Sequence, residues 1–112
     1  MKLYAVDELL KVGQGDPDFL AFMLETFVES CEDAIQGFTQ GMQQGNLTML
    51  KTTAHTLRPN LTHLRALQLL PPVEALDEWQ GGFEPETLQL LVDSTILMLR
   101  DVVTQIRLDT KA

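Results

Sequence analysis

The stretch Leu47–Leu64, LTMLKTTAHTLRPNLTHL, decides the fold of this 112-residue chain. Its apolar residues recur at alternating steps of three and four, which predicts a helix with one buried stripe. That stripe comprises Leu47, Leu50, Ala54, Leu57, Leu61 and Leu64. At about 100° per residue, His55 lies about 130° from the centre of the stripe. We therefore expect His55 on the exposed side of the helix rather than in the core.

Two cations flank His55 on the same side of the predicted helix. Lys51 lies four residues before it and Arg58 three residues after it, so both side chains can reach the space above the imidazole. The chain has 16 acidic and 8 basic residues, yet no Asp or Glu lies between Asp33 and Glu74. The sequence therefore predicts a small, locally non-negative patch around His55, which suits a group that must carry an anion.

The composition excludes several classes of protein. A formal net charge of −8 argues against nucleic acid and against membrane surfaces, because both bind extended basic surface. The single cysteine, Cys31, cannot form an internal disulfide, and we interpret it as a small core residue in a reducing cytoplasm. No signal peptide is evident, and no segment approaches the roughly 18 apolar residues of a membrane span. We expect one soluble, cytoplasmic domain over residues 1–112.

Helix signals dominate the chain, and strand signals are nearly absent. Asp7 is expected to cap a short opening helix over Glu8–Val12, which Gly13 then breaks. Asp16 is a good N-cap for a long second helix, with Pro17 at its first helical position. The N-terminal third of the chain therefore predicts one short helix followed by a long one.

The long helix is expected to end near Gln44, where Gly45 supplies the C-terminal stop. Gly37 and Gly41 are poor helix formers, costing about 1 kcal/mol each against alanine. They mark either a close contact with another helix or a frayed last turn. Asn46 then follows as a good N-cap for the helix that bears the histidine.

Pro59 complicates the course of the helix that bears His55. It cannot donate to the carbonyl four residues back, which is that of His55 itself, and the usual cost is about 3 kcal/mol and a kink. The helix either kinks and continues to Leu64 or ends just after the histidine. We favour the kink, because Leu61 and Leu64 keep the apolar stripe in phase.

Two further helices complete the prediction. A short one begins at Pro71-Pro72, passes through Trp79 and is ended by Gly81-Gly82. The last begins at Glu84-Pro85 and carries a regular apolar face as far as Ile106. The expected fold is all-α, an antiparallel up-down four-helix bundle with a short extra N-terminal helix.

Three features resemble the histidine-containing phosphotransfer (HPt) domain of bacterial multistep phosphorelays, over nearly the full length of the chain. The segment Gly15–Leu20, GDPDFL, followed by Leu24 and Phe27, looks like the family's G-D-x-x-F-L entry into its long second helix. The segment Ala54–Arg58, AHTLR, is similar to the family's A-H-x-L-K phosphoacceptor motif. The third feature is the order and approximate length of the helices.

The resemblance implies that His55 accepts a phosphoryl group from an aspartate of one receiver domain and passes it to another. The attacking atom would be the outward nitrogen, Nε2. The partners would be response-regulator receiver domains or a hybrid sensor histidine kinase, and the chain would be a monomeric phosphoryl carrier rather than an enzyme. No cofactor is expected on this chain, because the receiver domain would bring Mg²⁺ and the aspartate.

Other residues are expected to support the phosphoryl group and the imidazole. Arg58 and Lys51 would offset the charge of the phosphorylated product. An acceptor for the Nδ1–H of His55 would come from the following short helix, where Glu74, Asp77 and Glu78 are available, and we select Asp77. The expected docking surface for the partner comprises Thr48, Thr52, Pro59 and Thr62.

The chain departs from the family pattern beside the phosphoacceptor. Arg58 stands where the family usually has a lysine, and Pro59 stands where it has a glycine. These departures motivate an alternative function, a bundle of the same fold that docks on a receiver or kinase without accepting phosphate. A metal-binding bundle is disfavoured, because such sites need inward Glu-x-x-His pairs, and Thr52 and Asn60 occupy the positions three before His55 and His63.

Overall fold

The computed structural model describes residues 2–110, which form an all-helical fold. The helices are α1 (Asp7–Val12), α2 (Pro17–Gln44), α3 (Leu47–His63), α4 (Leu70–Asp77) and α5 (Pro85–Thr110). This confirms the predicted all-α class, and the described part of the chain contains no strand. None of these helices is both long and apolar enough to cross a membrane.

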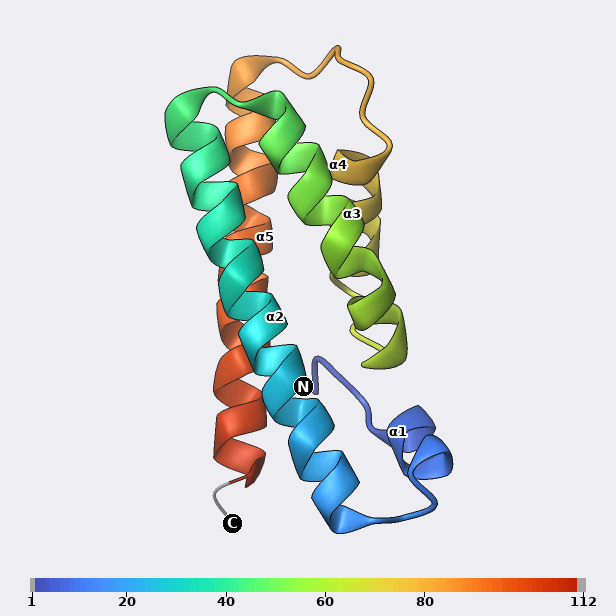
Figure 1. Cartoon of the computed structure of the whole chain (residues 1–112). Coiled ribbons are helices and arrows are strands. Elements are labelled where there is room, and N and C mark those ends of the chain that lie inside the picture. The colour runs from blue at the N-terminus through green and yellow to red at the C-terminus, as the bar shows by residue number, and fades with distance from the viewer. Residues whose placement is uncertain (1, 111–112) are drawn as a thin grey trace.

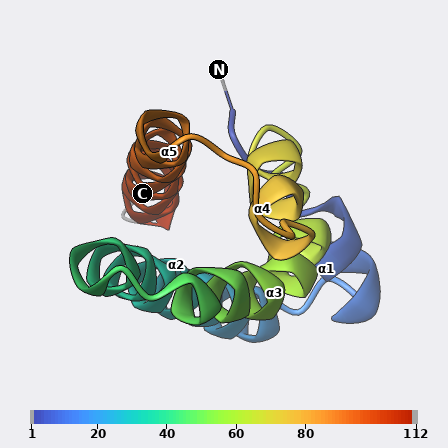
Figure 2. The same cartoon turned by 90° about the horizontal axis from the view of Figure 1, so that it is seen from above.

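The four later helices alternate in direction along the chain (Figure 1). α2 packs against α3 on one side and α5 on the other, and α3 packs in turn against α4. Seen from above, α3 lies between α2 and α4, and α5 flanks α2 (Figure 2). The contact between α4 and α5 is much smaller, because α4 packs mainly on α3. α3 is thus held between a long helix and a short one, and it is α3 that carries His55.

Local side-chain chemistry sets the ends of α2 and α3 as the sequence predicts. The Asp16 carboxylate accepts a hydrogen bond from the backbone N–H of Asp18 at 2.9 Å, at the start of α2. Gly45 ends the same helix with a φ of 60°, a left-handed conformation that glycine adopts without penalty. The Asn46 side chain then accepts from the N–H of Met49 at 3.0 Å and starts α3.

Three predicted details are wrong. α1 begins at Asp7 itself with Val6 as N-cap, so Asp7 stabilises the first turn through its charge rather than capping it. α4 ends at Asp77, and Trp79 lies beyond it, where its ring packs against that of Phe83 with centroids 5.6 Å apart. Leu47, which the sequence assigns to the buried stripe, is 47% exposed as the first residue of α3.

Pro59 does not end its helix, since α3 continues through it to His63. The residues that follow the proline explain why. Leu61 and Leu64 are each 1% exposed, and burying one leucine side chain contributes about 1.5–3 kcal/mol. That gain offsets the roughly 3 kcal/mol cost of a proline inside a helix. Of the two courses that the sequence allows, the helix therefore continues past Pro59 rather than ending just after His55.

Gly37 and Gly41 mark a close contact between α2 and α3 rather than a frayed turn. A Cβ atom added to Gly37 would lie 2.5 Å from Oγ1 of Thr53, and one added to Gly41 would lie 2.8 Å from Cδ2 of Leu50. Neither atom fits unless the Thr53 or Leu50 side chain of α3 moves. The two glycines therefore let α3 approach α2 closely and set the position of the surface that carries His55.

Candidate functional site

His55 projects from the exposed side of α3, as its place on the helix predicts. Its side chain is 79% exposed. Its neighbours Ala54 and Leu57 are fully buried and face the core. The packing of α3 against α2 and α4 therefore presents the imidazole to the outside.

Asp77 lies against the imidazole from the last residue of α4. Nδ1 of His55 is 3.1 Å from Oδ1 and 3.3 Å from Oδ2 of Asp77. Val73 and Leu76, both fully buried, anchor α4 against the core and so fix the position of Asp77. A carboxylate can only accept a hydrogen bond, so Nδ1 carries the proton, and in the neutral ring the lone pair lies on Nε2.

Arg58 holds the other side of the Asp77 carboxylate. One guanidinium nitrogen, Nη1, donates to Oδ2 of Asp77 at 2.9 Å and to Oε1 of Glu78 at 3.4 Å. The other, Nη2, lies 3.8 Å from Oε1 of Glu74. The hydrogen bond from Arg58 is the main cause that lowers the pKa of Asp77, with a further contribution from His55 and an opposing effect of burial. Asp77 is therefore ionised at neutral pH, where its carboxylate can accept the hydrogen bond from Nδ1 of His55.

The charge around His55 differs from the predicted non-negative patch. α4 brings the three carboxylates of Glu74, Asp77 and Glu78 to Arg58. The sequence window without acids does not show this, because these residues reach the patch only through the packing of α4 on α3. Arg58 consequently acts on Asp77 in the structure rather than facing the space above the imidazole.

Lys51 is the second predicted cation, and its environment is different. It is half-buried on α3, four residues before His55. It forms no ion pair with any other residue in the range 2–110. Of the two cations that flank His55, Lys51 is thus the one that forms no ion pair in the described residues.

The four residues of the expected docking surface, Thr48, Thr52, Pro59 and Thr62, are all exposed along α3. The Thr62 hydroxyl donates back to the carbonyl of Arg58 at 3.2 Å, so it serves the helix itself. Thr52 has a different setting, because it lines a shallow cleft of about 210 Å³ between α2 and α3. The structure therefore places only part of this set beside a concave surface.

That cleft contains polar residues that sequence reasoning did not select. Ser30 and Asp33 of α2 face Thr52 and Thr56 of α3 across it. The Ser30 hydroxyl accepts a hydrogen bond from the Asn60 side chain at 2.7 Å, which links the two helices. Thr56 could have been selected from the sequence, because it is next to His55. Ser30 and Asp33 could be found only from the packing of α2 on α3.

Other chemistries find little support among the described residues. In the range 2–110, no group of three or more His, Cys, Asp or Glu side chains is arranged to hold a metal ion. Cys31 is buried, and burial together with the neighbouring charge of Glu32 raises the pKa of its thiol to about 12. A thiol with that pKa is not a nucleophile at neutral pH.

No family model, curated protein or solved structure matches this chain. What the protein does must therefore be inferred from the chemistry around His55. An exposed imidazole, oriented through Nδ1 by an ionised carboxylate, can act as a nucleophile or as a proton carrier at Nε2.

Proposed function

We propose that this chain is a histidine-containing phosphotransfer protein that accepts a phosphoryl group on His55 from a receiver-domain aspartate and passes it to another receiver domain. In this proposal α2 to α5 constitute the family's antiparallel up-down four-helix bundle, with α1 as an extra helix. The observation that carries it is the exposed His55 ring whose Nδ1 lies 3.1 Å from Asp77. Nε2 has no hydrogen-bond partner among the described residues and is free to attack.

The reaction depends mainly on in-line positioning and charge neutralisation, and it needs a fixed tautomer at His55. The Nε2 lone pair would attack the phosphorus of an aspartyl phosphate in line with the leaving oxygen. The N–P bond forms as the bond from phosphorus to the acyl oxygen breaks, and the aspartate leaves as a carboxylate. The phosphorylated ring keeps its proton on Nδ1, and Asp77 stabilises the resulting positive ring by accepting that hydrogen bond. Transfer to a second aspartate is the reverse of these steps.

Arg58 and Lys51 have separate parts in this proposal. Arg58 is a positioning residue, because it holds Asp77 ionised and oriented through the 2.9 Å hydrogen bond. Lys51 would offset the charge of the phosphoryl group, since no carboxylate in the described chain pairs with it. The receiver domain would bring Mg²⁺ together with its aspartate, so the chain would carry the group without turnover of its own.

The experiment is a two-step transfer. A panel of receiver domains is charged with ³²P-labelled acetyl phosphate and Mg²⁺, purified, and mixed with this chain. The proposal predicts that label moves to the chain in an acid-labile form, and moves on when an unlabelled receiver domain is added. His63→Gln, a change at the exposed histidine of the same helix, should transfer normally, whereas His55→Gln should not accept label. Failure of every charged receiver to donate would contradict the carrier function.

A second function, docking without phosphate transfer, is favoured by one observation. The three carboxylates around Arg58 make the side of His55 that faces α4 less suited to an anion. The docking function predicts that a receiver or kinase binds the chain equally well with His55→Gln, and that no label is transferred. Binding that is accompanied by transfer would instead support the carrier.

A further inference from the structure

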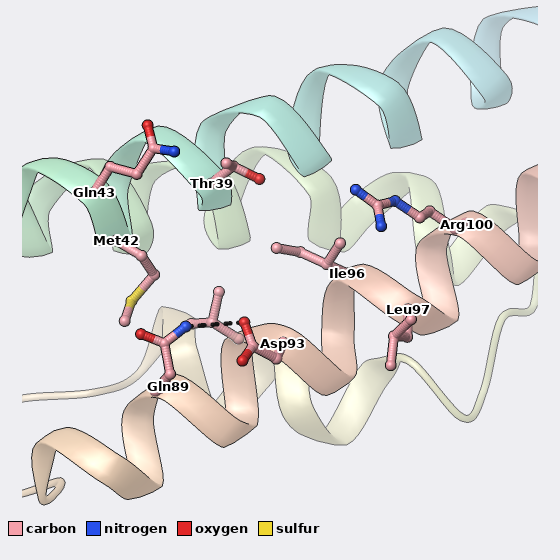
Figure 3. A pocket seen from close by; sticks show the side chains of 9 residues that line it. Thr39, Met42, Gln43, Gln89, Asp93, Ile96, Leu97 and Arg100 are labelled. Carbon is pink, nitrogen blue, oxygen red and sulfur yellow. Dashed lines mark hydrogen bonds between the residues drawn. The ribbon is translucent and has the colours of Figure 1, made fainter.

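An open groove lies between α2 and α5, on the side of α2 turned away from α3 (Figure 3). Its volume is about 530 Å³, and side chains from both helices line it. Met42 and Ile96 are its partly buried apolar walls. Leu97, at the edge of the groove, is 60% exposed. A second hollow of about 350 Å³ shares Arg100 with the first, so the groove continues along the pair of helices.

The charges of α5 follow a regular pattern along this side. Glu86, Asp93, Arg100 and Arg107 are spaced seven residues apart, and all four are exposed. Residues seven apart on a helix differ by only about 20° in direction, so the four lie along one face. Two acids are thus followed by two bases over about 32 Å of helix.

This order is complementary to itself when two copies run antiparallel. With the twofold axis between Ile96 and Leu97, Asp93 of one copy lies opposite Arg100 of the other, because both are the same distance from the axis. Glu86 lies opposite Arg107 in the same register, although Arg107 also pairs with Glu32 of its own α2 at 3.2 Å, so Asp93 and Arg100 are the principal pair. A parallel pair would instead place acid against acid and base against base, which is unfavourable.

We propose that a second copy of this chain occupies the groove, in an antiparallel twofold dimer formed by α5 and the adjoining side of α2. Leu97 of each copy would enter the groove of the other beside Met42 and Ile96, a self-complementary contact of the kind that closes a twofold dimer. Arg100 is available for this pairing, since it forms no ion pair with any other residue of the described range. The dimer differs from the monomer that the HPt resemblance implies.

The proposed interface leaves the histidine accessible. Every residue that lines the groove belongs to α2 or α5, whereas His55 lies on α3 and faces Asp77 on α4. The dimer proposal can therefore be tested independently of the function proposed for His55. A partner bound at the histidine and a second copy bound at the groove use different surfaces.

The first test is the mass of the purified chain in solution, measured by sedimentation velocity over a concentration series up to about 1 mM. We expect a species of twice the 12.6 kDa chain mass, with dissociation on dilution. Leu97→Asp should weaken dimerisation at least about tenfold, as expected for an apolar contact at the centre of an interface. Leu67→Asp is the matched control, because Leu67 is 59% exposed but lies outside the groove, and it should leave the dimer unchanged.

The second test concerns orientation. Asp93→Arg and Arg100→Glu should each weaken the dimer, because each change alone places like charges opposite one another. The double variant carrying both changes should restore dimerisation, since the charges are again complementary in the antiparallel register. A chain that is monomeric up to about 1 mM, or a dimer that tolerates Leu97→Asp, would overturn the proposal. Circular dichroism of each variant checks that the helices are retained.

Discussion

At the scale of single residues, the behaviour of His55 depends on a chain of contacts that begins at Arg58. The guanidinium fixes Asp77 through a 2.9 Å hydrogen bond, and Asp77 accepts from Nδ1 of the imidazole at 3.1 Å. The imidazole is itself 79% exposed, so packing alone does not fix its orientation. The tautomer that leaves the lone pair on Nε2 is therefore set by Asp77.

Asp77→Asn tests this dependence. The amide keeps the shape of the carboxylate but loses its charge, so it stabilises the phosphorylated ring less and no longer imposes one tautomer. We expect phosphoryl transfer to His55 to slow by about 10- to 100-fold, the loss typical when the carboxylate that orients a metal-ligating histidine is removed. In ¹⁵N NMR spectra, the neutral ring of the variant should show a mixture of tautomers.

Glu78→Gln is the control for that change. Oε1 of Glu78 lies 3.4 Å from Nη1 of Arg58, its side chain is 68% exposed, and it forms no hydrogen bond or ion pair with His55. Transfer rates and the His55 tautomer should match those of the unmodified chain. An Asp77→Asn variant that transferred at the normal rate would show that Asp77 only holds α4 in place.

The acid titration of Asp77 provides a second prediction at this scale. Arg58 is the main cause of the lowered pKa of Asp77, so Arg58→Gln should raise that pKa towards the ordinary value of 3.8. A carboxyl whose pKa is lower in the folded state stabilises the fold above its ordinary pKa, and this contribution is lost as pH falls through the folded value. Stability below about pH 4 should therefore vary less with pH in Arg58→Gln.

The measurement is the ¹³C NMR titration of the Asp77 carboxyl, with unfolding followed at each pH. Lys51→Gln removes a cation from the same helix that has no ion pair in the described chain, and it should leave the Asp77 midpoint unchanged. An unchanged midpoint in Arg58→Gln would mean that the guanidinium does not hold the carboxylate in solution.

At the scale of helices, the contact between α2 and α3 places the site. Gly37→Ala would put a methyl group 2.5 Å from Oγ1 of Thr53. The helix propensity of alanine favours the change by about 1 kcal/mol, but overpacking costs about 1–3 kcal/mol, so we expect a net loss of stability. Thr53→Ala removes Oγ1 and Cγ2, the two nearest of the Thr53 atoms, and in the Gly37→Ala background it should recover stability in urea unfolding. A more stable Gly37→Ala single variant would contradict the close contact.

Replacing Pro59, in contrast to Gly37, is expected to increase stability. It is exposed within α3 and removes the hydrogen bond to the carbonyl of His55, while the helix continues to His63. Pro59→Ala restores the donor without burying new surface, so it should stabilise the chain by about 1–3 kcal/mol. Thermal unfolding measures the change, and a lower midpoint would show that α3 is distorted at Pro59 in a way that alanine cannot adopt.

The sequence predicts local features of these helices well and their mutual contacts poorly. Asp16, Gly45 and Asn46 set helix ends by contacts within four residues, so their roles can be inferred without the fold. The ion pairs of Arg58 join residues up to 20 apart. The sequence offers Glu74, Asp77 and Glu78 as acceptors for His55, but nothing in it shows that all three carboxylates contact Arg58. α4 ends at Asp77, before the glycines, because Trp79 packs beyond it on the core.

At the scale of the whole molecule, the N-terminal segment joins helices that are distant in sequence. The backbone N–H of Leu3 donates to the Gln105 side chain, and that of Ala5 donates to the carbonyl of Leu64, both at 2.8 Å. The Tyr4 hydroxyl donates to the carboxylate of Asp109 near the end of α5. The segment thus connects the end of α3 with the end of α5, although it contains no helix of its own.

Tyr4→Phe tests this connection. The ring stays buried, but the hydrogen bond to Asp109 is lost, so the free energy of unfolding in urea should decrease at neutral pH. Lys2 is the main cause of the lowered pKa of Asp109, and Tyr4 adds to it, so the stabilisation should be lost as pH falls through the folded value. The difference between the variant and the unmodified chain should therefore shrink in acid. A difference that grew in acid would contradict the contact.

The most direct measurement of the central claim is the intact mass of the chain after incubation with a charged receiver domain, Mg²⁺ and neutral buffer. We predict the gain of one phosphoryl group that is lost in acid, is retained in His63→Gln and is absent in His55→Gln. The two histidines lie on the same helix and are both exposed, so the comparison separates a specific acceptor from a merely accessible ring. A phosphoryl gain that persists in His55→Gln, or none in any variant, would contradict the account.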